Sequence, residues 1–298
     1  FPDFLLCRAP EPLDDVRKKK LETNANIKAD NVISAPDVDS IYKVPLNLEK
    51  EGLGMKLLAH LSLKPKQKPD WSGWETLVNN LANPKHQIKI AMICKYLDIG
   101  NYSLQDSYIS IREAIEHAAA NVSAKVKIVW VDSKTYEKYP QKLEELKSYA
   151  GVIVPGGFGG SGVEGKMAAV KFCRENKIPY LGLCYGMQLA VVEFARNVCG
   201  LKDANTTEVD QNTPNPVIDI QPSQKKFMEQ NLYGATMRLG AYAAILKEGS
   251  QVLSLYQQTS RLTEDTSQLS SVEAFRIGIT QPNQKIVLER HRHRYEVN

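Results

Sequence analysis

The sequence lacks the features that mark several classes of protein. Its 298 residues carry a net charge of +4, a bias too small to indicate binding to nucleic acid. No run approaches the roughly 18 consecutive apolar residues that a membrane-spanning helix needs, so we expect no membrane association. The cysteine count is odd and no C-x-x-C occurs, which argues against a disulfide framework or a zinc site. We therefore expect free thiols, a reducing and cytoplasmic environment, and no metal site for the five cysteines, which are Cys7, Cys94, Cys173, Cys184 and Cys199.

Two further absences concern the start of the chain and the binding of nucleotides. The chain opens on Phe1-Pro2-Asp3, without an initiator methionine or a signal peptide, so we expect it to begin inside a longer product. No G-x-x-x-x-G-K-[ST] occurs, so the sequence holds no phosphate-binding loop of that type. What is present, 43% hydrophobic and 24% charged residues, is ordinary for a globular protein with its own core.

Three stretches of the chain differ in pattern. Residues 1–62 hold two short apolar runs and a charged helix candidate at 14–23, which is too little for a complete α/β domain and predicts the end of one. Residues 63–87 are rich in proline and lysine around Pro65 and Pro69, with a short helix at 71–81, and predict a linker. Residues 88–298 form the third stretch, whose first half is regular.

Apolar strand patterns alternate with helical spacing in this third stretch. The predicted strands cover 88–94, 126–131, 151–154 and 178–183, and the predicted helices cover 103–122, 135–149, 163–176 and 187–199. This alternation predicts an α/β fold with a doubly wound, mostly parallel sheet and helices on both faces. After residue 200 the pattern changes to short strands and loops.

The strongest chemical signal is Gly182-Leu-Cys-Tyr-Gly186, between a predicted strand and a predicted helix. Glycines on both sides of a nucleophile allow a tight turn that holds the central residue out of the chain. Cys184 then stands at a helix start, where the helix dipole favours the nucleophilic thiolate. The alternative is a structural cysteine, but the flanking glycines and the strand–turn–helix context favour the nucleophile.

A second glycine-rich segment, Pro155-Gly-Gly-Phe-Gly-Gly160, follows the preceding predicted strand. In a parallel sheet it lies beside Cys184 at the carboxyl edge, where ligands bind. A backbone N–H of this segment and that of Tyr185 are candidate oxyanion donors. The glycines from Gly157 to Gly162 also match the dinucleotide fingerprint G-x-G-x-x-G, but the next strand ends in Cys184 and not in the acidic residue that this fingerprint needs. We therefore set the dinucleotide interpretation aside.

Both motifs resemble those of class I glutamine amidotransferases, whose fold is flavodoxin-like. Four further strings resemble the CTP synthase family, and the resemblance covers essentially the whole chain. It implies that 1–62 is the C-terminal part of a synthetase (nucleotide) domain and that 88–298 is a glutamine amidotransferase type 1 domain with an incomplete C-terminus. The four strings are Asp37-Val-Asp-Ser-Ile-Tyr-Lys-Val-Pro45, Asp203-Ala-Asn-Thr-Thr-Glu208, Thr236-Met-Arg-Leu-Gly240 and Arg290-His-Arg-His-Arg-Tyr-Glu-Val-Asn298.

The resemblance implies a reaction in two halves. Glutamine is hydrolysed at Cys184 through a thioester, and the ammonia serves the ATP-dependent amination of UTP to CTP. The family uses Mg²⁺ with ATP and is homo-oligomeric, as a tetramer; we assign no metal or cofactor ligand to this chain.

The resemblance also assigns the glutamine site. It implies that the backbone N–H groups of Gly157 and Tyr185 form the oxyanion hole, and that Gln188, Glu208 and Arg294 contact glutamine. The chemistry agrees, because a free amino acid needs an anion for its ammonium and a guanidinium for its carboxylate. The alternatives are a capping side chain at Gln188, a surface carboxylate at Glu208 and a solvated basic segment at Arg294.

In the first stretch, the resemblance implies nucleotide contacts. Arg8, Asp37 and Val38 match positions that contact ATP, and Lys20 matches a position that contacts UTP or CTP. Without the resemblance each is an ordinary surface charge or strand residue.

The sequence departs from the family pattern in ways that bear on activity. In the family, the His-x-Glu pair that completes the catalytic triad lies beyond the string that ends here at Asn298, so we expect the isolated chain to be impaired. His293 and Glu296 are a weak substitute, because their spacing is three and they lie in the glutamine-contact string. Ser161 stands where the family often has an arginine linked to GTP activation, which puts GTP control in doubt. The rival function is an inactive glutamine-binding or interaction module.

Overall fold

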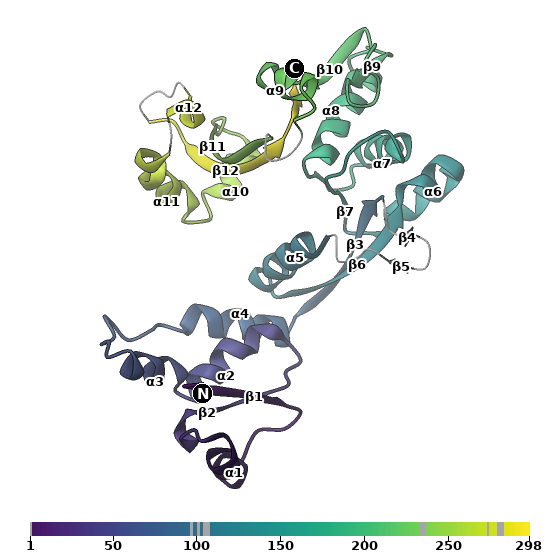
Figure 1. Ribbon diagram of the computed structural model, residues 1–298. Coiled ribbons are helices and arrows are strands. Elements are labelled where there is room, and N and C mark those ends of the chain that lie inside the picture. Colours follow the sequence, from purple (N-terminus) through teal and green to yellow (C-terminus); the bar gives the residue numbers. More distant parts are fainter. Residues whose placement is uncertain are drawn as a thin grey trace. The chain divides into compact units, whose positions relative to one another are not determined.

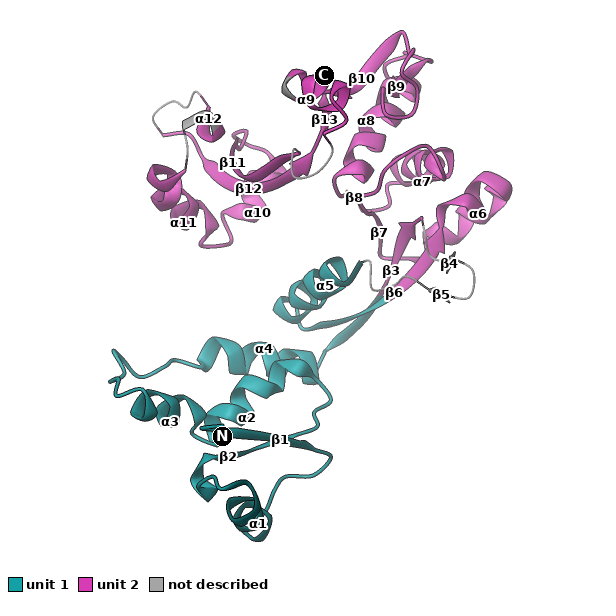
Figure 2. Cartoon of the chain, in the orientation of Figure 1, with its two compact units in different colours: residues 1–88, 106–127 teal, residues 89–105, 128–298 magenta. Residues whose placement is uncertain are grey.

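The computed structural model describes residues 2–95, 98–99, 102–103, 108–232, 237–272, 274–278 and 283–298 (Figure 1). The chain divides into two compact units, which we describe separately (Figure 2). Unit 1 comprises Phe1–Ile88 and Asp106–Lys127, and unit 2 comprises Lys89–Gln105 and Ile128–Asn298. The domain boundaries inferred from the sequence, at 62 and 88, stay predictions.

Unit 1 is built on a parallel pair of strands, with Leu5 opposite Val32 and Ala9 opposite Pro36. A helix connects the two strands and is capped by Asp14, whose carboxylate accepts a hydrogen bond from the Arg17 backbone N–H at 2.8 Å. Its elements are β1 Leu5–Ala9, α1 Asp15–Ala25, η1 Ala29–Asn31, β2 Val32–Pro36, η2 Ile41–Lys43, α2 Val44–Lys50, α3 Leu53–His60, α4 Ser72–Ala82 and α5 Ile109–Asn121.

Helix α4 lies inside the stretch that the sequence predicts as a linker, close to the predicted bounds 71–81. It packs on α5, and the side-chain amide of Asn80 donates to the carbonyl of Ala120 at 3.0 Å. The indole N–H of Trp74 donates to the carbonyl of Tyr42 at 2.7 Å, which ties α4 to η2. The start of the helix predicted at 103–122 falls partly on residues 104–107, outside the described residues.

Unit 2 contains a four-stranded sheet with the order β6-β3-β7-β8. Strand β7 pairs in parallel with both neighbours, β3 and β8, and α7 and α8 pack together beside them. The predicted α/β fold with a mostly parallel sheet is confirmed. The elements of this part are β3 His86–Cys94, β4 Asp98–Ile99, β5 Tyr102–Ser103, β6 Ala124–Asp132, α6 Ser133–Lys138, η4 Pro140–Ser148, β7 Gly151–Val154, α7 Val163–Glu175, β8 Tyr180–Gly182 and α8 Tyr185–Asn197.

The single helix predicted at 135–149 is wrong. Helix α6 ends at Lys138, and a 3₁₀ helix, η4, begins at Pro140. Proline lacks the N–H for an α-helical bond and disfavours helical geometry in the residue before it. Tyr139 accordingly has φ −134° and ψ 75°, so the chain turns between the two helices.

The irregular pattern after residue 200 forms two small sheets and several short helices. Strand β10 pairs in parallel with β9 and antiparallel with β13, and β11 and β12 form an antiparallel ribbon. These elements are β9 Ala204–Thr206, β10 Asn215–Ile220, α9 Pro222–Glu229, β11 Arg238–Ile245, α10 Gln251–Tyr256, α11 Arg261–Gln268, η5 Leu269–Ser271, α12 Ala274–Ile277, β12 Ile286–His293 and β13 Tyr295–Val297.

Two apolar clusters hold unit 2 together. The first joins the sheet to α6, η4 and α7 around Ile93, Val152 and Tyr136. The second joins α7, α8 and β10 around Leu189 and Ile218, and so fixes α8 against the strands that follow it. No helix within the described ranges is long and apolar enough to span a membrane.

Candidate active site

Cys184 stands in a sharp turn between β8 and α8. Its φ of 51° and ψ of −107° lie in a strained region that non-glycine residues rarely adopt. A Cβ at Gly182 would lie 2.6 Å from the backbone nitrogen of Met187, and one at Gly186 would lie 2.0 Å from the carbonyl oxygen of Val154. Only glycine fits at either position. The turn therefore has the geometry of a nucleophile elbow, with the Cys184 side chain exposed.

The surroundings of Cys184 do not favour the thiolate. Partial burial raises the pKa of the Cys184 thiol above its ordinary value, and the nearby carboxylate of Glu208 raises it further. The backbone N–H of Tyr185 and the charge of Arg292 act in the opposite direction. The backbone N–H of Tyr185 at the helix start thus lowers the pKa of Cys184, but burial raises it by more. The raised pKa favours the thiol form of Cys184, so a base would have to take its proton in a reaction at the sulfur.

The glycine-rich loop after β7 lies next to Cys184, and the side chain of Lys95 holds it in place. A Cβ at Gly156 would lie 3.5 Å from the Cβ of Cys184. The ammonium of Lys95 donates to the carbonyls of Gly159 and Ser161 at 3.0 and 3.2 Å, and also to that of Phe158. These bonds fix the loop through its carbonyl oxygens, which sets where its N–H groups can point.

Two further contacts close the loop onto its neighbours. The hydroxyl of Tyr185 donates to the carbonyl of Gly159 at 3.0 Å, so the residue after Cys184 also holds the loop. The backbone N–H of Gly159 donates to Oε1 of Glu208 at 2.6 Å. Glu208, which the resemblance assigns to glutamine binding, is here engaged with the loop, and burial raises its pKa.

Lys166 on α7 is a functional candidate that the sequence did not reveal. It is fully buried, and its Nζ has no hydrogen-bond partner among the residues that the structure describes. Burial, and then the charge of Lys95, lower its pKa to about 8. A Cβ at Gly157 would lie 3.7 Å from this Nζ, so a second lysine lies against the predicted oxyanion loop. In the sequence, Lys166 reads as one more lysine on an amphipathic helix.

The structure buries two of the predicted glutamine contacts. Gln188, on the first turn of α8, donates from Nε2 to the carbonyl of Tyr295 at 2.9 Å and so ties α8 to β13. Arg294 lies between β12 and β13, and its Nη1 donates to Oε1 of Gln224 at 2.8 Å. Arg294 is therefore buried and hydrogen-bonded, and it does not belong to a solvated basic segment. The role of both residues in glutamine binding stays a prediction.

Arg292 and His293 refine the picture of the basic string. The charge of Arg292 lowers the pKa of Cys184, and nothing in the sequence sets this arginine apart from its neighbours. His293 contacts Glu296, at 3.5 Å, the ring of His291 and the carbonyl of Tyr295. None of these contacts is with Cys184. His293 and Glu296 therefore remain a weak substitute for the catalytic pair, as the sequence indicates.

Comparison with known proteins agrees with this geometry. Residues 103–298 match the family described as glutamine amidotransferase class-I, and residues 1–63 match the one described as CTP synthase N-terminus. A solved structure, the glutaminase domain of Trypanosoma brucei CTPS with bound acivicin, superposes with a TM-score of 0.56 at 34% identity, over 71% of this chain and 68% of that one.

The chain belongs to the CTP synthase family.

Curated CTP synthases match the chain along its whole length. That of Sulfolobus acidocaldarius is 45% identical over 297 residues, covering 100% of this chain and 50% of the relative. That of Methanocaldococcus jannaschii is 44% identical over 302 residues, covering 100% and 49%. The chain therefore spans about half the length of the curated CTP synthases that it matches.

The nucleotide contacts that the CTP synthase resemblance implies lie in unit 1. Arg8, near the end of β1, and Asp37, directly after β2, meet at the carboxyl edge of the parallel pair, with Nε 2.8 Å from Oδ1. Both are exposed, and Val38 follows Asp37. Lys20 lies on the exposed side of α1, away from any ion pair within the described part of the chain. The structure thus brings Arg8 and Asp37 together but not Lys20.

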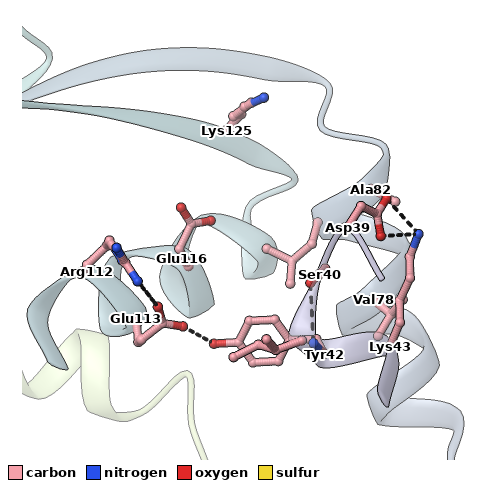
Figure 3. A pocket seen from close by; sticks show the side chains of 12 residues that line it. Asp39, Ser40, Tyr42, Lys43, Val78, Ala82, Arg112, Glu113, Glu116 and Lys125 are labelled. Carbon is pink, nitrogen blue, oxygen red and sulfur yellow. Dashed lines mark hydrogen bonds and ion pairs between the residues drawn. The ribbon is translucent and has the colours of Figure 1, made fainter. Parts of the chain in front are cut away.

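Unit 1 also holds a cavity of about 650 Å³ between η2, α4 and α5 (Figure 3). Its polar side chains largely satisfy one another. The hydroxyl of Tyr42 donates to Glu113 at 2.6 Å and lies 2.7 Å from Nε2 of His117, while Lys43 pairs with Asp39 at 2.8 Å. The lining residues include none of the four predicted nucleotide contacts. We therefore assign this cavity no part in the family reaction.

Proposed function

We propose that the chain carries the glutamine-hydrolysing site of a CTP synthase, with Cys184 as the nucleophile. The observation that supports this most is the strained backbone of Cys184 between two glycines that no other residue can replace. Backbone strain of this kind persists where the surrounding structure enforces it, and it exposes the sulfur at the edge of the sheet.

In the proposed reaction, the Cys184 sulfur attacks the side-chain amide carbon of glutamine. The negative charge on the amide oxygen is stabilised by the backbone N–H groups of Gly157 and Tyr185. Collapse of this intermediate breaks the C–N bond and leaves a thioester, and water then releases glutamate and frees the thiol. Each turnover consumes one glutamine and one water, and yields one glutamate and one ammonia.

The reaction at Cys184 includes two proton transfers, and each needs a second side chain that can accept or donate a proton. The raised pKa of the thiol means that a base must take its proton, and the leaving nitrogen must receive one. By resemblance we assign both transfers to the family His-x-Glu pair and not to His293, whose contacts lie elsewhere. Lys95 and Lys166, which lie next to Gly157 in the glycine-rich loop, would add positive charge near the developing oxyanion.

The substrate-holding residues follow from the same resemblance. Arg294 would bind the carboxylate of glutamine and Glu208 its ammonium, while Gln188 would position it. Because Glu208 accepts the Gly159 N–H at 2.6 Å, binding of glutamine would have to break or share this bond. Glu208 would therefore exchange a contact with the loop for one with the substrate.

The ammonia would serve the amination of UTP in the whole protein. We propose that Arg8, Asp37 and Val38 contact ATP and that Lys20 contacts UTP or CTP. The exposed guanidinium of Arg8 at a carboxyl strand edge is chemically suited to a nucleotide phosphate. Mg²⁺, when bound with ATP, shields the phosphate charges; we assign it no ligand in this chain. A cytoplasmic homotetramer would be the family form, and Ser161 leaves GTP activation doubtful.

Labelling of Cys184 tests this proposal. The chain is treated with acivicin, the compound bound in the Trypanosoma brucei domain, with and without excess glutamine, and adducts are mapped by mass spectrometry. We expect one adduct, at Cys184, that glutamine suppresses and that Cys184→Ser abolishes. Cys199 is the matched control, because it is also an exposed thiol but lies outside the elbow. Equal labelling of Cys199, or no protection by glutamine, would refute the assignment.

The rival function is a glutamine-binding module without turnover. The raised pKa of Cys184 is the observation that favours it. Ammonia release separates the two: an active site produces ammonia in a Cys184-dependent manner, whereas a binding module shows saturable glutamine binding and no ammonia. The assay should use the chain as it stands and one extended through the family His-x-Glu pair.

A further inference from the structure

Two histidines and a carboxylate converge where β12 passes into β13. His291 and His293 are two residues apart on β12, so their side chains point to the same face of the ribbon. Nδ1 of His291 lies 2.8 Å from Nε2 of His293, and that nitrogen lies 3.5 Å from Oε1 of Glu296. One ligand atom from each side chain lies within 4.8 Å of the other two, and all three residues are half-buried.

The hydrogen bonds fix which ring nitrogen is available. Nδ1 of His293 lies 3.1 Å from the carbonyl oxygen of Tyr295, and a carbonyl only accepts, so this nitrogen carries the proton. In a neutral imidazole Nε2 then offers its lone pair toward His291 and Glu296. A histidine whose second nitrogen donates to a carbonyl is the usual arrangement of a metal ligand.

We propose that His291, His293 and Glu296 form a binding site for one divalent transition metal ion such as Zn²⁺. The distances suit it: ligand atoms about 2.05 Å from a tetrahedral Zn²⁺ are about 3.3 Å apart, close to the observed 2.8 and 3.5 Å. Binding moves the Nδ1 proton of His291 to its Nε2 and frees Nδ1 as a ligand. Two imidazoles and one carboxylate leave a fourth position for water.

Arg238 competes with a metal ion for the carboxylate of Glu296 and so limits the affinity of this site. Its guanidinium pairs with Glu296 and stacks on Tyr242 with Cζ 3.9 Å from the ring centroid. Arg238 and His293 both face Oε1 of Glu296, so metal binding at Oε1 requires Arg238 to move to the second carboxylate oxygen. The nearby positive charge opposes a cation, however, and we expect affinity in the micromolar range, not the tighter binding of a structural zinc site.

The preference for a transition metal follows from the donors. Imidazole nitrogen suits Zn²⁺, Ni²⁺ and Co²⁺, whereas Mg²⁺ and Ca²⁺ require oxygen ligands, which here number only one. The site is thus separate in chemistry from any Mg²⁺ bound with ATP. It does not depend on glutamine hydrolysis, although it lies in the same string as Arg294.

Calorimetry with the full chain tests the site, with ZnCl₂ and MgCl₂ as probes and Cys184→Ser combined with Cys199→Ser as the background, so that neither exposed thiol contributes. We expect one Zn²⁺ per chain with a dissociation constant below about 100 µM, and no saturable Mg²⁺ binding. His293→Asn and Glu296→Gln should each weaken Zn²⁺ at least about 10-fold, the lower limit for loss of even an outer-sphere partner. His86→Gln, an exposed histidine far along the chain, is the matched control and should leave the affinity unchanged.

A second measurement guards against misfolding of the variants. The metal-dependent rise in melting temperature is recorded for each variant against its own metal-free value, so that loss of packing is not counted as loss of metal. Arg238→Gln should tighten Zn²⁺ about fivefold or more by removing the opposing charge. No saturable Zn²⁺ binding, or unchanged binding in His293→Asn, would overturn the proposal. Weaker binding in a folded Arg238→Gln would overturn the role given to Arg238.

Discussion

Replacement of the buried Lys166 by methionine should stabilise the protein at neutral pH and change how its stability depends on pH. Lys166 is fully buried without a hydrogen-bond partner among the described residues, and its pKa falls from 10.5 to about 8. Between these values the unfolded chain binds a proton that the folded chain has lost. Stability therefore rises with pH from about 8 to 10.5, and the full cost of burying the charge is present below pH 8.

The size of the effect follows from the shift. One pKa unit corresponds to about 1.4 kcal/mol, so a fall from 10.5 to about 8 corresponds to a cost on the order of 3 kcal/mol at pH 7. Methionine has a similar length and no charge, so it removes the cost of burying the ammonium, although it also loses the contact of Nζ with the Tyr185 ring at 5.8 Å. We expect Lys166→Met to gain up to about 3 kcal/mol at pH 7 and almost nothing at pH 10.5.

Urea unfolding at several pH values from 7 to 10.5, about half a unit apart, measures this directly. The difference between wild type and Lys166→Met at each pH isolates Lys166, because other groups that titrate in this range are common to both proteins. Lys171→Met, on the exposed side of the same helix, is the matched control and should show no such difference. A stability difference that does not change with pH would refute the reasoning, because it would mean that Lys166 stays charged or finds a partner.

Two further substitutions test other parts of the site. Arg294→Ala should weaken glutamine binding in calorimetry by about 1.5–3 kcal/mol, the worth of a charge-assisted pair, while Arg290→Ala, on the exposed side of β12, should have little effect; equal losses would indicate a diffuse basic patch. Gly186→Ala should lower the free energy of unfolding by about 1–3 kcal/mol or more, because its Cβ would overlap the Val154 carbonyl, whereas Gly73→Ala, with nothing within 4 Å, should be tolerated. A Gly186→Ala chain as stable as wild type would mean that the elbow can relax.

Sequence reasoning reached the fold and the elbow because both depend on local patterns. Strand β7 was predicted at its observed bounds, and the turn at Cys184 was found from two glycines and the change from strand to helix. The helix at 135–149 failed at Pro140, a local signal that the apolar spacing had overridden. These outcomes follow from short-range geometry that a single sequence carries.

The residues that sequence reasoning missed depend on contacts between distant segments. Lys95 is recognisable only once β3 and the glycine-rich loop lie side by side and its ammonium meets three carbonyls. Lys166 differs from Lys171, the exposed lysine of the same helix, only in which way it faces. His291 joins His293 and Glu296 only because the chain bends between β12 and β13, which the spacing of these residues does not indicate.

If Glu208 binds the ammonium of glutamine as proposed, its contacts with the loop and with Cys184 give it a second role. Its carboxylate is buried and its pKa is raised, yet it keeps the Gly159 N–H at 2.6 Å while Lys95 holds the same loop by its carbonyls. The same carboxylate raises the pKa of Cys184 and so favours the thiol form of this side chain. If the ammonium of glutamine takes up Glu208, that charge is neutralised, and the thiol loses one of the two influences that suppress the thiolate. Binding of the correct substrate and activation of the nucleophile would then be coupled through one residue, which makes Glu208 more than an anchor for the ammonium group.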